Sequence, residues 1–157
     1  MTTTPTFINR RALIAAGAAT LLLPSLAKAQ QENEPASQRT TDMKIRMTFD
    51  DHTMIATLYD NPSAQDFYTM LPLDLTIEDF SSNEKIVHLP RKLTEEGSGP
   101  FGNEQPYDLC YYKPWGNLAL FYTEYEHPGL IRLGRFDEGQ EALHVRGKYP
   151  VRIEPVR

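Results

Sequence analysis

Aromatic residues concentrate in one stretch of the sequence. Seven lie between positions 107 and 125: Tyr107, Tyr111, Tyr112, Trp115, Phe121, Tyr122 and Tyr125. Rings with a polar tip favour surfaces that are half apolar and half wet. Trp115 lies between Pro114 and Gly116, residues typical of a turn, so it belongs at the rim of a sheet. The stretch indicates an apolar groove for a small molecule or a peptide segment, with Tyr112, Trp115 and Phe121 as its walls. Core packing is the alternative explanation for most of these rings.

Two polar residues are candidates for contacting a ligand in such a groove. Arg91 lies between Leu89 and Leu93, and an arginine at a strand end binds a carboxylate or a carbonyl oxygen with fixed two-pronged geometry. Asn117, directly after the Pro-Trp-Gly turn, is the second candidate. For Arg91, an ion pair with one of the chain's 21 acidic residues is the alternative.

The sequence carries no strong signal for a catalytic or cofactor site. None of the four histidines has the spacing of a metal-ligand pair, and the single cysteine, Cys110, lies in an apolar strand pattern typical of a buried thiol. Residues 97–102 match the dinucleotide fingerprint G-x-G-x-x-G, but two glutamates precede them and no helix pattern follows, so a flexible loop is expected. We therefore predict no metal and no cofactor, and the catalytic residues, if any, stay unknown.

The elements that position these residues are predicted to be mostly strands. Asn61 as an N-cap and Pro62 at the first helical position predict one helix, which Pro72 ends. Period-two or short apolar runs predict strands over 43–49, 53–59, 73–77, 86–89, 109–112, 118–122, 130–136 and 151–153. Many short strands with one helix indicate an all-β barrel or sandwich with a capping helix at an open end.

The predicted strand 118–122 is apolar on both faces. Leu118, Leu120 and Tyr122 share one face, while Ala119 and Phe121 share the other. One face is expected to fill the barrel. The other face needs a cover, which the helix, a loop or a ligand could supply.

Several blocks of the sequence are distinctive. The most specific is Pro-Trp-Gly-Asn-Leu-Ala at 114–119, and the others are 60–62, 71–73 and 89–93. Together these blocks resemble a family of small bacterial exported proteins with a cyclophilin-like barrel. The resemblance extends from about residue 43 to about residue 143. It implies an all-β fold with a capping helix, a cyclophilin-like eight-stranded barrel that is closed or partly open, and it implies no particular reaction. We expect this domain to span residues 43–157.

The fold resemblance also suggests an alternative function, peptidyl-prolyl cis-trans isomerisation. Cyclophilins carry a Phe-His-Arg strand whose arginine steadies the twisted proline amide. Residues 87–91, Val-His-Leu-Pro-Arg, match that strand only in part. The Gln-Phe-Phe block of cyclophilins is missing, and residues 119–122 are only a weak counterpart of it. The leading interpretation is therefore a binding module, and whether the protein is an enzyme stays open.

Residues 1–29 are interpreted as an export signal peptide. Arg10 and Arg11 precede an apolar run that is too short to span a bilayer, and Ala27-Lys28-Ala29 has the small-x-small pattern of a cleavage site. The arginine pair resembles a twin-arginine signal, and a general secretion signal is the alternative. We expect cleavage between Ala29 and Gln30, no stable membrane anchor afterwards, and a periplasmic or secreted protein.

Composition constrains the region beyond this signal. Residues 30–42 contain no apolar side chain larger than alanine and are expected to form a disordered linker. The net charge of the chain is −5, and the predicted signal holds three basic residues and no acid, so the remainder is more acidic still. That charge argues against a nucleic-acid partner, because such a partner requires a basic surface.

Overall fold

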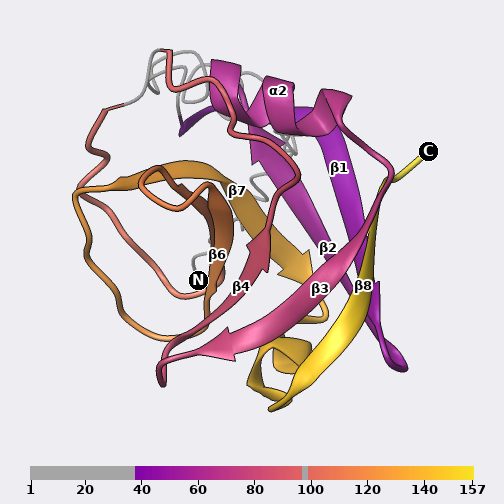
Figure 1. Ribbon diagram of the computed structural model, residues 1–157. Helices are drawn as coiled ribbons and strands as arrows, with labels where there is room; N and C mark the ends of the chain where they lie inside the picture. The colour runs from indigo at the N-terminus through magenta and orange to yellow at the C-terminus, as the bar shows by residue number, and fades with distance from the viewer. Residues whose placement is uncertain (1–37, 97–98) are drawn as a thin grey trace, which may run out of the picture. The chain divides into compact units, whose positions relative to one another are not determined.

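The computed structural model describes residues 38–96 and 99–157, which form a closed antiparallel barrel (Figure 1). The strand order around the barrel is β1-β2-β7-β5-β6-β4-β3-β8. The strands are β1 (Thr40–Phe49), β2 (His52–Tyr59), β3 (Leu73–Phe80), β4 (Glu84–His88), β5 (Asp108–Tyr112), β6 (Asn117–Phe121), β7 (Leu130–Glu138) and β8 (Lys148–Pro155). The predicted all-β fold, an eight-stranded barrel with a helix, is confirmed.

The N-terminal predictions fall largely outside the described residues. The export signal at 1–29, with Arg10, Arg11 and the cleavage site after Ala29, lies there, as do residues 30–37 of the predicted linker. The prediction that the linker extends to residue 42 is wrong, because β1 begins at Thr40. Thr40 pairs with Tyr59, and the Thr41 hydroxyl donates to the Leu58 carbonyl at 3.0 Å. Backbone pairing to β2 extends the strand over residues that have little apolar surface to bury.

The barrel interior is filled by alternate residues of the strands. On β2, Met54, Ala56 and Leu58 are fully buried, as their period-two spacing predicts. Helix α2 (Pro62–Thr69) is capped by Asn61, whose side chain accepts a hydrogen bond from the Ala64 amide. It lies across one end of the barrel in Figure 1 and buries Phe67 in the interior cluster. At the other end lies the 3₁₀ helix η2 (Gln140–His144), which buries Ala142 and Leu143.

The two faces of β6 contribute to different clusters. Leu118 and Leu120 point into the interior cluster. Ala119 and Phe121 point outward and form a second cluster with Cys110 and Leu130. The cover that this outer face needs comes partly from Phe101, Tyr112 and Tyr125, which pack against it. What these residues leave open is the candidate site.

One charged side chain lies inside the barrel. Lys85 is fully buried, and its ammonium lies 2.7 Å from a carboxylate oxygen of Asp79, the residue directly opposite on β3. Asp79 also accepts hydrogen bonds from Lys85 and from the Gly147 amide. Burial alone would raise the pKa of Asp79, but these hydrogen bonds outweigh it and hold the pKa below its ordinary value. The pair joins β3 to β4 at the point where the hairpin turns.

No helix in the described part of the chain is long and apolar enough to cross a membrane.

Candidate functional site

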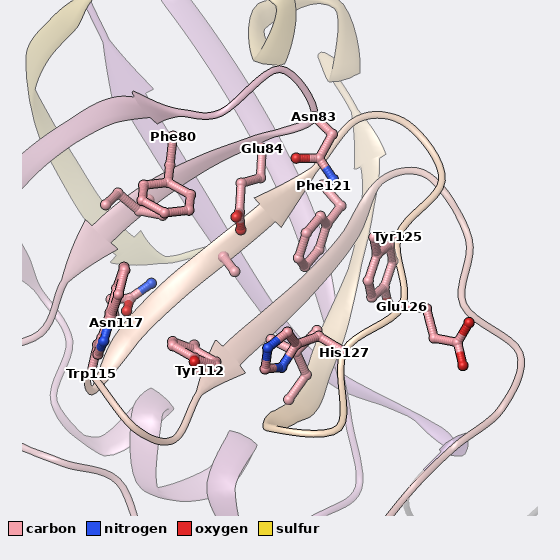
Figure 2. A pocket seen from close by; sticks show the side chains of 13 residues that line it. Phe80, Asn83, Glu84, Tyr112, Trp115, Asn117, Phe121, Tyr125, Glu126 and His127 are labelled. Atoms are coloured by element: carbon pink, nitrogen blue, oxygen red, sulfur yellow. The ribbon is translucent and has the colours of Figure 1, made fainter.

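A cavity of about 330 Å³ opens on the outer face of the barrel, over β4, β5 and β6 (Figure 2). We call it the outer groove. Its lining combines six aromatic or imidazole rings with a few polar and aliphatic side chains: Phe80, Asn83, Glu84, Ile86, Tyr112, Trp115, Asn117, Ala119, Phe121, Tyr125, Glu126, His127 and Leu130. Its volume lies at the lower end of the range of small-molecule sites, roughly 300–1,000 Å³.

Strand register places the central residues of the groove side by side. Glu84 on β4 lies opposite Phe80 on β3 and opposite Phe121 on β6. One step along the same face, Ile86 lies opposite Ala119, and one step further Asn117 lies opposite Tyr112. Cross-strand neighbours on one face have Cβ atoms about 5 Å apart, so a carboxylate is set between two phenyl rings by pairing alone.

Trp115 is held at the rim by a tight turn between β5 and β6. The Gly116 amide donates to the Tyr112 carbonyl at 2.9 Å, and Gly116 has a φ of 71°, a left-handed conformation that glycine adopts without strain. The indole packs edge-on against Phe80 and Tyr112, each with a ring-centre separation of 5.4 Å. Trp115 is 54% exposed, which confirms that it belongs to the rim and not to the core.

The opposite wall is a loop between β6 and β7 that a buried ionic cluster anchors. Tyr125 stacks on Phe121 with ring centres 3.8 Å apart, and its hydroxyl donates to the Asp108 carboxylate at 2.7 Å. Asp108 is fully buried and also accepts hydrogen bonds from Arg132 at 3.3 Å and from Arg135 at 3.1 Å. Burial and the neighbouring thiol and carboxylate raise the pKa of Tyr125, so the hydroxyl stays protonated and remains a donor.

Glu84 is the acidic group at the centre of the groove. Figure 2 shows its carboxylate directed into the cavity between Phe80 and Phe121. Within the described residues it has no hydrogen-bond or ion-pair partner, and burial raises its pKa to about 7. A partly desolvated carboxylate without a partner has a perturbed pKa, and titratable groups with perturbed pKa values are often found at functional sites.

Asn117 is a second polar group with an unmet hydrogen bond. Its side chain is 1% exposed and donates to the Leu118 carbonyl at 3.0 Å. The side-chain oxygen Oδ1 is buried and has no hydrogen-bond partner. Buried acceptors without a partner are uncommon. Because this oxygen is closed to solvent, a ligand in the groove could reach it only after the side chain rotates.

The structure brings together four of the five candidate ligand-binding residues. Tyr112, Trp115, Asn117 and Phe121 all line the outer groove. Arg91 does not line it. The Arg91 guanidinium donates two hydrogen bonds to Asp66 on α2, at 2.7 and 3.0 Å, which is the ion-pair alternative for this residue. No described residue that lines the groove is an arginine, so the isomerase alternative lacks its central group there.

Sequence analysis missed Glu84, Phe80 and His127. Phe80 and Glu84 flank a turn and are four residues apart, and nothing in that spacing marks a site. His127 meets Tyr112 edge-on at 5.0 Å through a loop contact that no periodicity predicts. Only the pairing of β4 with β6 brings Glu84 to the aromatic stretch.

The remaining chemical groups lie away from the groove surface or are paired. Cys110 is fully buried, as predicted, and burial raises the pKa of its thiol, which disfavours the reactive thiolate form. In the described ranges, no cluster of three His, Cys, Asp or Glu side chains could hold a metal ion. The fingerprint-like segment has Gly97 and Ser98 outside the described residues, and residues 99–107, which lead to β5, contain no helix.

A second cavity, of about 340 Å³, has a different character. It is lined by Arg46, Pro72, Arg152, Glu154, Pro155 and Arg157. Arg152 is already bound to Asp74 at 2.7 Å and to Glu154 at 3.3 Å, and Arg46 lies 3.4 Å from Glu154. No aromatic ring is among these described lining residues, so the outer groove is the stronger candidate site.

Comparisons with known proteins support the fold. The model of the cyclophilin-like family matches residues 47–154. The structure is also similar to the solution structure of the hypothetical protein AF2241 from Archaeoglobus fulgidus. The TM-score is 0.62 and the sequence identity 18%, over 75% of this chain and 98% of that chain. No curated protein matches the chain. The structural similarity supports the barrel fold and specifies neither ligand nor reaction.

Proposed function

The chain belongs to the cyclophilin-like family, and we propose that it is a binding module that takes a small molecule in the outer groove. The observation that carries this proposal is where apolar surface is exposed. Among the described residues the exposed large hydrophobic side chains are Phe80, 38% exposed, and Trp115, 54% exposed, and these two rings touch at the groove. Exposed aromatic surface beside a cavity typically marks a ligand site.

The groove is also built to hold its shape without a ligand. The turn that carries Trp115 is tied to the neighbouring loop by the Lys113 amide, which donates to the Gly129 carbonyl at 3.0 Å. A side chain at Gly129 would place its Cβ 2.9 Å from the Tyr112 ring, so the two segments approach as closely as glycine permits. A preformed cavity reduces the ordering cost of binding.

Replacing Trp115 with alanine tests this proposal. Because the indole is half exposed, its loss is expected to lower the free energy of unfolding by about 1–3 kcal/mol, less than the loss of a core tryptophan. The same loss is expected to weaken binding of any groove ligand at least about tenfold, since exposed aromatic anchors dominate such sites. A panel of small metabolites and short peptides is screened by thermal shift, and hits are titrated by calorimetry with both proteins.

Tyr68→Ala is the matched control for loss of a ring, because Tyr68 lies on α2 and does not line the groove. It is expected to leave the affinity of every hit unchanged. Hits that bind Trp115→Ala as tightly as the parent protein contradict the groove as the site. A large stability loss in Trp115→Ala would instead make the indole a packing residue.

We also propose that the protein is exported, on the strength of the arginine pair and the Ala27-Lys28-Ala29 pattern. Expressed with its full sequence in a bacterium, it is expected to yield a periplasmic or secreted form that begins at Gln30. Intact-mass spectrometry of that fraction reads the N-terminus directly. A mature form that retains residues 21–23 would contradict cleavage.

A further inference from the structure

The charged groups that line the outer groove are acidic. Glu84 and Glu126 both contribute to its lining, and no lysine or arginine is among the described lining residues. The other titratable groups around the cavity are Tyr112, Tyr125 and His127. A carboxylate or phosphate ligand would therefore meet two acids and no fixed positive charge. The charge of the lining favours a cation.

Glu84 is placed where a ligand cation would be its partner. It lies between Phe80 and Phe121, and among the described residues no donor reaches its carboxylate. Ionising a carboxyl group in such surroundings is costly unless an opposite charge lies within a few ångströms. The nearest lysine in sequence, Lys85, points to the opposite face of β4 and is bound to Asp79. From the groove side, no described residue supplies a counter-charge.

The rings of the groove suit the same kind of ligand. Phe80, Trp115, Tyr112 and His127 form a continuous series in which neighbouring rings meet edge-on, at ring-centre separations of 5.0–5.4 Å. Figure 2 shows this series on one side of the cavity and Phe121 with Tyr125 on the other. Aromatic faces attract organic cations, and tryptophan does so most strongly. A carboxylate enclosed by such rings attracts a group that is both cationic and apolar.

Asn117 holds a second acceptor near the groove. Its Oδ1 lacks a partner and accepts hydrogen bonds only, but it is closed to solvent. A ligand N–H or O–H donor could reach it only after the Asn117 side chain rotates, so the Glu84 carboxylate is the acceptor that the groove presents directly.

We propose that the outer groove binds a small organic cation, an alkylammonium or methylated ammonium group, with the Glu84 carboxylate as its counter-charge and the rings around its apolar substituents. This inference rests on the proposed function and names the ligand class of the same site. The cavity of about 330 Å³ accommodates a molecule of this size and not a folded partner.

The test uses two probes of the same shape and different charge. Choline carries a quaternary ammonium, and 3,3-dimethyl-1-butanol is its neutral carbon analogue. Trp115 is the chain's single tryptophan, so its emission reports from the rim of the groove. Choline is expected to change this emission and to bind at least about tenfold more tightly than the neutral analogue. Equal affinities for the two probes overturn the inference, as does binding of the analogue alone.

Glu84→Gln removes the charge while keeping the shape of the side chain. It is expected to weaken choline binding about tenfold or more and to leave the weak binding of the neutral analogue unchanged. Glu138→Gln, an exposed position on β7 outside the groove, controls for the loss of one negative charge and is expected to bind choline as the parent does. Choline binding that Glu84→Gln leaves intact overturns the inference.

The two proposals fail separately. If uncharged ligands bind and Trp115→Ala abolishes their binding, while choline does not bind, the groove is a binding site and the cation inference is wrong. If neither probe nor any member of the metabolite panel binds, both are wrong. The comparison of choline with its neutral analogue on the parent protein needs no variant to fold.

Discussion

Replacing Asp108 with alanine is expected to lower the free energy of unfolding by about 3–5 kcal/mol, because it leaves the buried Arg132 guanidinium without its carboxylate partner. The Asp108 carboxylate is fully buried and lies 3.3 Å from Arg132 and 3.1 Å from Arg135. Arg132 is itself 5% exposed, so without the carboxylate its guanidinium would remain in a dry environment with one fewer acceptor. Thermal or urea denaturation followed by circular dichroism measures the loss, which corresponds to roughly 10–20 °C in Tm.

The same change should loosen the groove. Tyr125 donates its hydroxyl to Asp108, so its ring would lose the contact that holds it against Phe121. The matched control is Asp74→Ala, which removes an aspartate that binds Arg152 at the surface, at 2.7 Å. Exposed ion pairs contribute little, so this control should melt close to the parent protein. Equal losses in the two variants would contradict the role assigned to the buried cluster.

Replacing Asp79 with alanine is expected to have an effect of similar size, about 3–5 kcal/mol, for the same reason. Lys85 is fully buried, and Asp79 at 2.7 Å is its ion-pair partner among the described residues. The double variant Asp79→Ala with Lys85→Met is expected to recover much of the loss, because an apolar side chain then replaces the orphaned ammonium. Glu78→Ala, which removes a more exposed ion pair with Lys148, is the control. A double variant no more stable than Asp79→Ala would contradict this account.

The effect of Asp79 also depends on pH. Its folded-state pKa lies below the ordinary carboxyl value of 3.8, chiefly because the hydrogen bonds from Lys85 and Gly147 outweigh desolvation by burial. A depressed pKa contributes stability that is present above the ordinary value and is lost as the pH falls through the folded-state value. The difference in Tm between the parent and Asp79→Ala is therefore expected to shrink below about pH 4. A difference that persists at low pH would point to lost packing.

The architecture was predictable from the sequence because local signals and burial agree there. Period-two alternation over 53–59 matches fully buried Met54, Ala56 and Leu58, and Asn61 caps the helix that Asn-Pro predicts. Because both faces of β6 carry apolar side chains, the sequence also indicated that one face fills the barrel and that the other face needs a cover. The structure has an outer cluster there, partly covered by other side chains. The start of β1 was missed by three residues, since backbone pairing to β2 extends it without apolar side chains.

The site was only partly predictable. Tyr112, Trp115, Asn117 and Phe121 could be found because they are close in sequence, on one hairpin and its turn. Arg91 could not be placed, because its partner Asp66 is 25 residues away on α2. Glu84 reaches Phe121 and the aromatic stretch only through the pairing of β4 with β6, a non-local contact that no short pattern encodes.

The central claim is that ligands of this protein bind in the outer groove, and nuclear magnetic resonance tests it most directly. The ¹⁵N-labelled protein is titrated with choline and with each ligand found by thermal shift. The account predicts that the Trp115 indole N–H, the Asn117 side-chain amide and the Glu84 backbone amide shift together. The amides around the second cavity, near Arg46 and Arg152, should stay in place. Shifts confined to that second cavity or to Arg91 and Asp66, with the groove signals unmoved, would contradict the account.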